Sequence, residues 1–583
     1  MSDRASTFLE NASAVARAFV QTVVFLDDHA FEGDAVEEAG ILVPPVGPLG
    51  ESQVHEGVAA SVAQVAGAAG AKTSEGVALD AQRASNQPPR ERKEAEEGGL
   101  DAKAIIEEFA KQSLICAVLQ PTLGGDMQAI KDAARRADVV VIDWVIHKVP
   151  GDFTGNLVTE ILKEDAARGG RLRLIAIYTI EPDLQKVLKL LRERLVTAEL
   201  VSTQDTLLSF RSSAFRIVVL AKPGARIPEQ TPERENIVEQ HDLPARLHHE
   251  FACLARGVIR NVALRGLAVL RDNTHEILAY LGSDLDAAFV AHRVLLAAPD
   301  DAADHAVALL GSELTSMLHG FDVRSEASAE RVQAWLNHQA KEYELAIDPK
   351  KPPRKLAPSG LEPLLRDGIS SWKDPDLSKS ARGRFFLHAT QTFLPSAADR
   401  AKSADLADLR FAVATSSVHL YEKTSVRADE SRSQNPQLKL GAIICNDTAE
   451  PRRYLVCLQP VCDSVRLDDE SDTRFPFLGA ELAKPGEPFE LVVEDGPGNF
   501  QRLRPDAKLA NIRLLAFRSK GRVVRATKRD TGFYFEGADG VYRWLGQLKE
   551  AQAQRVAHKF ATDISRVGLD ESEWLRLSRG GKD

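Results

Sequence analysis

The sequence predicts a multidomain chain. Its N-terminal part is an α/β doubly wound parallel sheet, its middle is α-helical, and its C-terminal domain is β-rich with terminal helices. Short apolar runs alternate with helical runs between residues 100 and 223, which indicates a parallel sheet covered by helices. Amphipathic segments follow over 243–344, and β-branched runs dominate from residue 438. A length of 583 residues leaves room for about three or four domains.

The composition is that of a globular protein outside the membrane. Hydrophobic residues make up 44% of the chain and charged residues 27%, and no run approaches the ~18 uncharged apolar residues of a membrane-spanning helix. The first residues lack the apolar core of a secretory signal, and five cysteines fit a reducing compartment. We therefore expect a cytoplasmic protein with no membrane contact. A net charge of -10, from 74 basic and 84 acidic residues, argues against coating nucleic acid through bulk charge.

The first elements are a helix, a strand and an insertion. Residues 4–20 carry apolar side chains at helical spacing, and QTVVFLDD (21–28) is an apolar run that ends in two aspartates. Residues 33–100 contain no Phe, Tyr or Trp and are rich in Ala, Gly and Glu. Such a segment lacks the large side chains whose burial offsets the entropy of ordering, so we expect a mobile insertion at 33–100.

Regular alternation returns at residue 100. The pattern predicts helices at 100–112, 127–137, 155–165 and 183–195, and strands at 114–121, 138–146, 172–179 and 215–223. The strand DVVVIDWVI has no polar alternation, as expected for a strand buried on both faces. An extra hairpin at 198–210 precedes the last strand.

Composition then sets the remaining boundaries. Four prolines in 346–360 indicate a linker or an extended segment, and residues 541–564 read as helix. The expected domains are 1–230, 231–345 with a long amphipathic helix at 243–282, 346–435 as linker plus helical region, and 436–583.

Polar side chains stand where the predicted N-terminal strands end. Asp27 and Asp28 end the first strand, Asp143 the central one, Thr179 the next and Lys222 the last. The carboxyl ends of parallel strands lie along one edge of a sheet, where ligands bind. We therefore expect these five side chains to meet in one pocket.

Three carboxylates and a lysine suit phosphoryl transfer onto an aspartate. Nucleophile and phosphoryl group are both negative, and a hard cation such as Mg²⁺ removes their repulsion. Asp27 and Asp28 supply metal ligands, and the carbonyl of Val145 adds another. Lys222 and the Thr179 hydroxyl then contact phosphoryl oxygens, which exist only after phosphorylation, so they can draw loops into a second state.

The motifs VVFLDD, VVVIDW, LIAIYT and VVLAKP resemble the receiver domain of bacterial two-component response regulators, over about residues 21–225. They are most similar to a divergent receiver family of larger bacterial proteins, associated with phage-defence operons. The resemblance implies a receiver (flavodoxin-like) fold that binds Mg²⁺ and takes a histidine-kinase-like or ATPase partner. By position it makes Asp143 the phosphoacceptor and a metal ligand, Asp27 and Asp28 metal ligands, Thr179 the switch residue and Lys222 the phosphate-contacting lysine.

Several alternatives stay open. The insertion and the bulky Trp144 leave room for a pseudo-receiver scaffold that is never phosphorylated. Residues 502–529 hold ten Lys or Arg against one acid, on two expected strands joined near 519–521, which suits a nucleic-acid-binding output. The helix at 243–282 is a candidate surface for homo-oligomers. No Walker, GxSxG or HExxH motif marks an effector enzyme.

Overall fold

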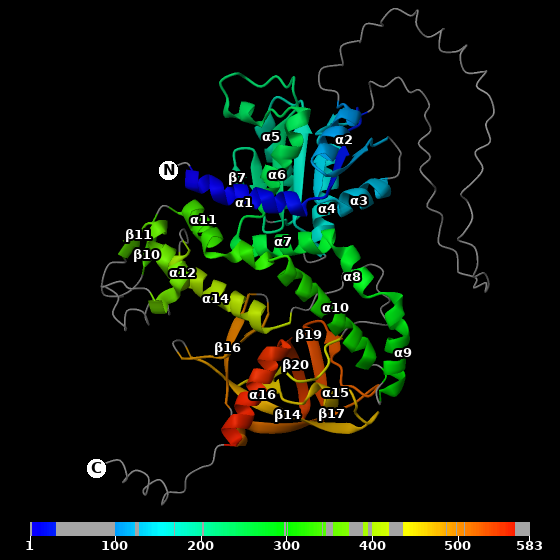
Figure 1. The fold of residues 1–583 in the computed structure, drawn as a ribbon, viewed down its shortest axis with the longest axis vertical. Coiled ribbons are helices and arrows are strands. Elements are labelled where there is room, and N and C mark those ends of the chain that lie inside the picture. The colour runs from blue at the N-terminus through cyan, green and yellow to red at the C-terminus, as the bar shows by residue number, and fades with distance from the viewer. Residues whose placement is uncertain are drawn as a thin grey trace, which may run out of the picture. The chain divides into compact units, whose positions relative to one another are not determined.

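The computed structural model describes residues 3–30, 100–122, 127–167, 170–200, 203–296, 299, 301–340, 342–345, 354–371, 389–394, 399–418, 435–484, 487–496, 498–506 and 508–565. The expected insertion at 33–100 lies outside these residues, apart from Leu100. The chain forms two compact units (Figure 1). The one unit joins Gln21–Ile161 to Arg173–Leu247, and the other joins Met1–Val20, Leu162–Leu172 and His248–Asp583.

A mixed sheet is the centre of the first unit, in the order β2-β1-β3-β6-β9-β8-β7. Five strands are parallel: β1 (Thr22–Leu26), β2 (Ile115–Leu119), β3 (Val139–Ile142), β6 (Arg173–Thr179) and β9 (Phe215–Ala221). In chain order they run 2-1-3-4-5, a doubly wound order. The hairpin β7 (Thr203–Thr206) and β8 (Ser209–Arg211) adds two antiparallel strands beside β9. The predicted parallel sheet and its extra hairpin are both present.

Helices cover both faces of this sheet, since every residue of β3, β6 and β9 is buried. The helices are α2 (Ala102–Lys111), α3 (Met127–Arg136), α4 (Asp152–Ala167) and α5 (Leu184–Thr197). Aspartates cap two of them: Asp101 accepts from the Ala104 N–H and Asp183 from the Lys186 N–H. A short hairpin of β4 (Val145–Ile146) and β5 (Val149–Pro150) follows β3.

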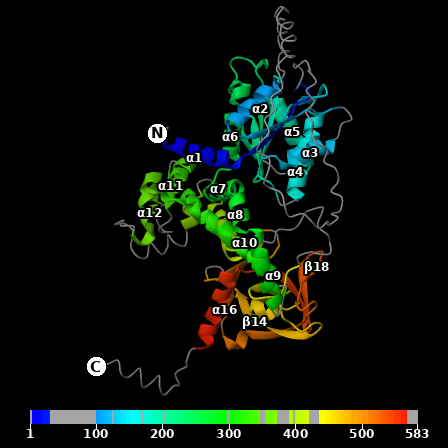
Figure 2. The ribbon, with the colours of Figure 1, turned by 45° about the vertical axis from the view of Figure 1, so that its right-hand side comes forward.

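Helices also dominate the middle of the chain (Figure 2). They are α6 (Leu243–Leu254), α7 (Val258–Asp272), α8 (Thr274–Tyr280), α9 (Asp286–Leu295), α10 (Asp301–Gly320) and α11 (Ala329–Gln339). Short 3₁₀ helices join several of them: η1 (Pro232–Asn236), η2 (Gln240–Asp242), η3 (Ser283–Leu285) and η4 (Val323–Ala327). The N-terminal helix α1 (Asp3–Phe19) packs on α7 and α11. The helix α1 is held by a stacked Phe19–Phe251 pair, and Arg271 donates to the Phe19 carbonyl at 2.9 Å.

The expected continuous helix at 243–282 is wrong. The segment is broken into α6, α7 and α8. Gly257, whose φ of +146° is outside the helical region, separates α6 from α7, and Asn273 separates α7 from α8. Its apolar side chains are also mostly buried within the chain: Phe251 is 0% exposed and Val269 3%. They pack in the helical region instead of forming an open stripe.

The described residues of the predicted linker region form short elements. These are β10 (Tyr343–Leu345), β11 (Arg354–Leu356), η5 (Pro358–Leu361), α12 (Glu362–Ser371) and α14 (Arg400–Ser416). Residues 346–353 and 419–434 lie outside the described residues.

A nine-stranded antiparallel sheet forms the core of the C-terminal domain. Its strands are β12 (Ala442–Asn446), β13 (Arg453–Cys457), β14 (Asp472–Leu482), β15 (Leu491–Glu494), β16 (Phe500–Pro505), β17 (Ile512–Arg518), β18 (Thr527–Arg529), β19 (Gly532–Gly537) and β20 (Gly540–Gln547). Because β13 pairs with β14 as well as with β12, the sheet closes into a barrel through β12, β20, β19, β17 and β14. Closure leaves the six strands of this ring without a free edge, whereas β15 and β18 remain edge strands.

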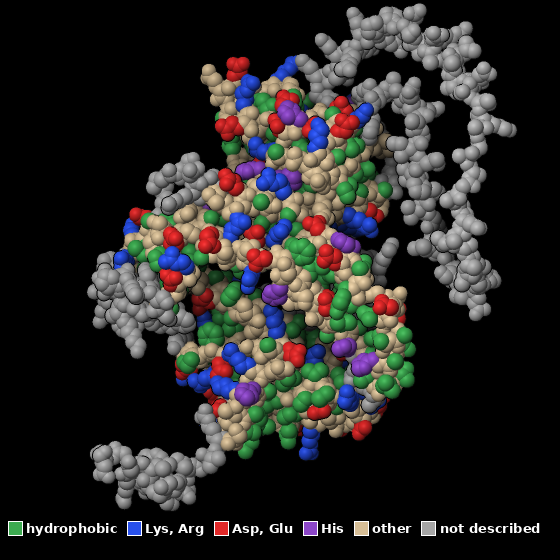
Figure 3. Space-filling model, viewed as in Figure 1, with side chains coloured by type: hydrophobic (Ala, Val, Ile, Leu, Met, Phe, Trp, Pro, Cys, Tyr) green, Lys and Arg blue, Asp and Glu red, His purple; other side chains and the backbone are tan. Residues whose placement is uncertain are grey.

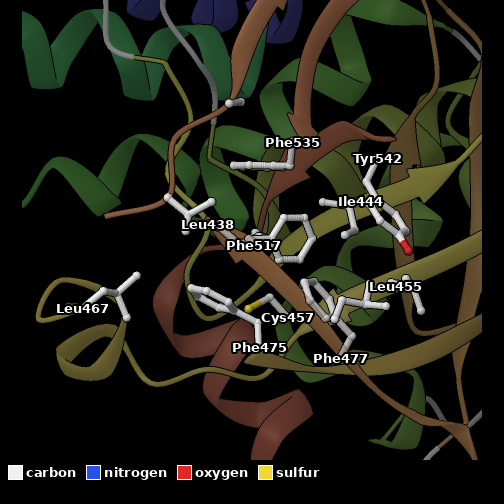
Figure 4. Close-up of a cluster of buried hydrophobic side chains, with 14 residues drawn as sticks. Leu438, Ile444, Leu455, Cys457, Leu467, Phe475, Phe477, Phe517, Phe535 and Tyr542 are labelled. Carbon is white, nitrogen blue, oxygen red and sulfur yellow. The ribbon is translucent and has the colours of Figure 1, made fainter. Parts of the chain in front are cut away.

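The barrel interior is aromatic (Figure 4). Four aromatic rings surround the ring of Phe517, and their centroids lie 5.7–6.3 Å from its centroid. They belong to Phe475, Phe477, Phe535 and Tyr542. Alternate residues on the same strands face a second core under α16 (Glu550–Ile564), through Ala553 and Val556. The shorter elements here are α15 (Val461–Ser464) and η7 (Leu509–Asn511).

Two sequence predictions in this domain are wrong. Residues 541–547 are strand, not helix: β20 pairs with β12 and β19 and points Tyr542 into the barrel. The strands of 502–529 do not form a ribbon with each other, since β17 pairs with β14 and β18 pairs with β19. Among the helices that the structure describes, none combines the length and hydropathy needed to cross a bilayer.

Candidate functional site

Each predicted site residue stands at the carboxyl edge of the parallel sheet. Asp27 and Asp28 directly follow β1, Asp143 follows β3, Thr179 is the last residue of β6, and Lys222 follows β9. The backbone fixes two of these ends. The Asp143 N–H donates to the Leu26 carbonyl at 2.9 Å, and the Lys222 N–H donates to the Thr179 carbonyl at 2.8 Å.

Lys222 joins two of the carboxylates directly. Its Nζ donates to Asp27 Oδ2 at 2.7 Å and to Asp143 Oδ2 at 2.5 Å. All three residues are buried, with exposures of 2% for Asp27, 6% for Asp143 and 4% for Lys222. The lysine was expected on a phosphoryl oxygen; here it donates to two of the acids.

Burial and charge shift the ionisation of this group. Burial raises the pKa of the Asp143 carboxyl, attraction to Lys222 lowers it, and repulsion from Asp27 raises it again; the net shift is upward. Burial lowers the pKa of the Lys222 ammonium, but Asp143 and Asp27 raise it by more, so Lys222 stays protonated. The Tyr178 ring lies 5.8 Å from Nζ, and burial raises the pKa of its hydroxyl, which keeps it neutral.

Asp28 is held differently and keeps one oxygen unbonded. Its Oδ2 accepts from the His147 N–H at 2.6 Å, and its carbonyl accepts from Gln120 Nε2 at 2.6 Å. Its Oδ1 is buried with no hydrogen-bond donor among the described residues, and His29 Nε2 lies 3.7 Å away. A buried carboxylate oxygen without a donor is costly unless a cation or water satisfies it.

The loop after β3 fixes Asp143. The Val145 N–H donates to Asp143 Oδ1 at 3.2 Å, and the Thr154 hydroxyl donates to the Asp143 carbonyl at 2.6 Å. Trp144 is buried, and the Gly151 N–H donates to its carbonyl at 2.8 Å. Gly151 has a φ of +78°, and a Cβ there would overlap the Trp144 ring, so the loop requires glycine.

Thr179 is fully buried and does not take part in the lysine network directly. Its hydroxyl accepts from the Glu181 N–H at 3.3 Å, which shapes the turn that leads to α5. The structure therefore brings Asp27, Asp143 and Lys222 into contact, ties Asp28 to the neighbouring loops, and joins Thr179 to Lys222 through the backbone.

Sequence reasoning missed three supports of the site. Gln120 directly follows β2, so the strand-end argument had a signal for it. His147 lies in a hairpin turn at a φ of +56°, and Thr154 lies in the first turn of α4. No sequence pattern indicates these two residues. The His147 backbone N–H donates to Asp28, and the Thr154 hydroxyl donates to the Asp143 backbone carbonyl, and both contacts depend on how the loop folds.

The donors fit Mg²⁺. No three His, Cys, Asp or Glu side chains within the described ranges gather as a ready-made metal cluster. Mg²⁺ does not require one, since it binds through one or two carboxylates, water and phosphate oxygens. The unbonded Asp28 Oδ1, at the same sheet edge as Asp27 and Asp143, is the kind of hard oxygen donor that this ion takes.

Comparison with known families identifies the domain that contains this edge. The family model of the response receiver domain matches residues 19–226. The chain carries a receiver domain. The match contains Asp27, Asp28, Asp143, Val145, Thr179 and Lys222, and it ends just after the lysine. No curated protein and no solved structure matched the chain in the two further comparisons.

Proposed function

We propose that the receiver domain accepts a phosphoryl group on Asp143 and controls the rest of the chain through protein contacts. The observation that carries the proposal is the buried network in which Lys222 bridges Asp27 and Asp143, at the edge where Asp28 keeps an unbonded oxygen. A structural ion pair needs one carboxylate for one lysine. Here two carboxylates share one lysine, and Asp28 follows Asp27 directly in the chain, so acidic oxygens remain for a cation.

In the proposed reaction, an Asp143 carboxylate oxygen forms a bond to phosphorus. The bond from phosphorus to the donor breaks at the same centre, and the donor leaves with the electron pair. The donor is a phosphohistidine of a kinase-like or ATPase partner, or a small acyl phosphate. Bound Mg²⁺ would supply the charge that screens the two anions. Asp27, Asp28, Asp143 and the Val145 carbonyl would hold it.

Lys222 and Thr179 supply the switch in this proposal. Lys222 exchanges its bond to Asp143 for one to a phosphoryl oxygen, and the Thr179 hydroxyl leaves the Glu181 N–H for another. Because the Thr179 hydroxyl shapes the turn before α5, its movement changes the start of that helix. The resemblance to receivers of phage-defence operons leads us to propose phage infection as the setting of the signal.

Acyl phosphorylation tests the proposal. The full chain is incubated with Mg²⁺ and acetyl phosphate, and an added phosphoryl group is measured by intact mass and by its loss in hydroxylamine. Asp143→Asn removes the acceptor, and Asp132→Asn, an exposed acid of α3, is the matched control. We expect modification of wild type and Asp132→Asn alone. An unmodified wild type, or equal modification of Asp143→Asn, overturns it.

A pseudo-receiver scaffold is the second candidate. Lys222 already satisfies both acids without metal or phosphate, which is what a constitutively closed site requires. An unmodified wild type in the same experiment favours this candidate.

Ion pairs weaken the nucleic-acid alternative. Within 502–529, Arg502, Arg504, Arg518 and Arg529 each pair with a carboxylate of the same unit. The positive charge of these arginines is therefore partly neutralised within the protein. Nothing at this surface favours nucleic acid over a protein partner.

A further inference from the structure

The segment α8–α10 exposes apolar side chains to an unusual degree. Six large ones are more than half exposed: Leu278, Tyr280, Val290, Val294, Leu295 and Val307, at 68%, 64%, 56%, 74%, 85% and 71%. Figure 3 shows hydrophobic side chains gathered over this part of the molecule. Helices with apolar residues on most faces are normally buried.

Within the described residues, the segment packs on the rest of the chain where it begins, through the buried Ile277 of α8, and where it ends. The second half of α10 packs on α7, where a Cβ at Gly266 would lie 3.2 Å from Leu318 Cδ2. The first half of α10, from Ala303 to Ser312, is exposed on all sides, and so is nearly all of α9. The rings of His292 and His305 lie 5.8 Å apart and hold α9 beside α10. The two helices thus form a hairpin that projects from these contacts.

Charge is scarce on this hairpin. Between residues 286 and 312 the charged residues are Asp286, Arg293, Asp300, Asp301 and Asp304, and no Lys or Glu occurs. A strongly charged partner would find no complementary surface here. Interfaces between identical chains, in contrast, are more apolar and poorer in charge than other interfaces.

We propose that α8–α10 is a dimerisation surface whose occupant is the same segment of a second copy of this chain. Two such hairpins related by a two-fold axis form a four-helix arrangement that buries both apolar surfaces. The six side chains, with the smaller apolar residues between them, expose roughly 600–900 Å². One partner of a standard stable interface contributes about 800 Å², so the surface is large enough for a stable dimer.

The dimer does not depend on phosphorylation of Asp143. It also lies at a different place from the surface expected from the sequence, the segment 243–282. The side chains of α6 and α7 that suggested that surface are mostly buried within the chain. Ile259 and Leu267 of α7 are exposed, but exposed apolar side chains are most numerous from α8 onwards.

Sedimentation velocity of the full chain, with light scattering for absolute mass, tests the proposal. The variants are Leu295→Glu on α9 and Val307→Glu on α10, each of which places a charge in the proposed interface. Leu509→Glu is the matched control, since Leu509 is 71% exposed in the C-terminal domain. Circular dichroism verifies that each variant is folded. Two variants are used so that the test remains possible if one of them does not fold.

We expect wild type and Leu509→Glu at twice the 63.7 kDa chain mass, and a twofold lower mass for Leu295→Glu and Val307→Glu. Two differently tagged wild-type copies, expressed together, should co-purify, and the same pair carrying Leu295→Glu should not. A monomeric wild type at high concentration overturns the proposal and assigns the surface to another segment or a different protein. Dimers that persist in both folded variants also overturn it.

Discussion

The Lys222 ammonium donates a hydrogen bond of 2.5 Å to the Asp143 carboxylate, across 79 positions of sequence. The same ammonium reaches Asp27 at 2.7 Å. One buried cation therefore holds together the ends of three strands, β1, β3 and β9, and the stability of the receiver domain is linked to the charges of its proposed reaction.

Replacing Lys222 by Met should destabilise the receiver domain strongly. The change leaves two carboxylates buried without their cation, and breaking a buried pair in this way costs about 3–5 kcal/mol. Because the folded-state pKa of Lys222 is raised, its contribution is present below the unfolded value of 10.5 and is lost as the pH rises through the folded value. Urea unfolding measures the loss. Lys189→Met, on the exposed side of α5, should change little, and an equal effect of both variants would show that the bridge contributes nothing.

Asp143→Asn should stabilise the unmodified receiver domain at neutral pH. The folded-state pKa of Asp143 is raised, with burial as the first cause. Its contribution is thus fully present below the unfolded value of 3.8 and is lost as the pH rises through the folded value. The amide carries no charge and avoids this loss. The difference in unfolding free energy, variant minus wild type, should grow as the pH rises from 3.8 through the folded-state value. A variant less stable than wild type at neutral pH contradicts this.

Mg²⁺ should raise the melting temperature of the wild type. A ligand that binds only the folded state stabilises it by about 2.7 kcal/mol at about 100 times its Kd. Asp28→Ala removes the unbonded oxygen and should abolish most of the shift, whereas Asp132→Ala, on the surface of α3, should keep it. A shift of the same size in all three proteins would mean that Mg²⁺ binds elsewhere.

Arg543→Met should weaken the C-terminal barrel at neutral pH and less so in acid. Arg543 donates to Asp447 and to the buried Asp495, and its hydrogen bond lowers the pKa of Asp447. A lowered folded pKa gives stability that is present above the unfolded value of 3.8 and lost as the pH falls through the folded value. Thermal unfolding at neutral and acidic pH measures this. Arg518→Met, which breaks only an exposed pair with Glu470, should change stability by less than ~1 kcal/mol.

Much of the first sheet follows from sequence patterns, because a strand buried on both faces must be apolar throughout. The run VVVI before Asp143 has this property, and the strand order brings the polar residue after each run to one edge. The C-terminal domain was less predictable. Tyr542 and its neighbours in β20 contain no continuous apolar run, since one face meets the barrel interior and the other meets residues near α16. Alternation over so short a segment does not separate strand from helix.

The sequence by itself determined which residues stand at the carboxyl edge: Asp27, Asp28, Asp143, Thr179 and Lys222. This was possible because strand ends are local features and parallel strands share one direction. Only the tertiary structure decided that Lys222 bridges Asp27 and Asp143 while Asp28 keeps an oxygen unbonded. These are distances between groups far apart in the chain, and burial, which shifts the pKa of Asp143, depends on every element packed around it. The tertiary structure also decided that Leu295 on α9 is exposed. A buried helix and an unpartnered helix can have the same spacing of apolar residues in sequence, and only the elements packed around them distinguish the two.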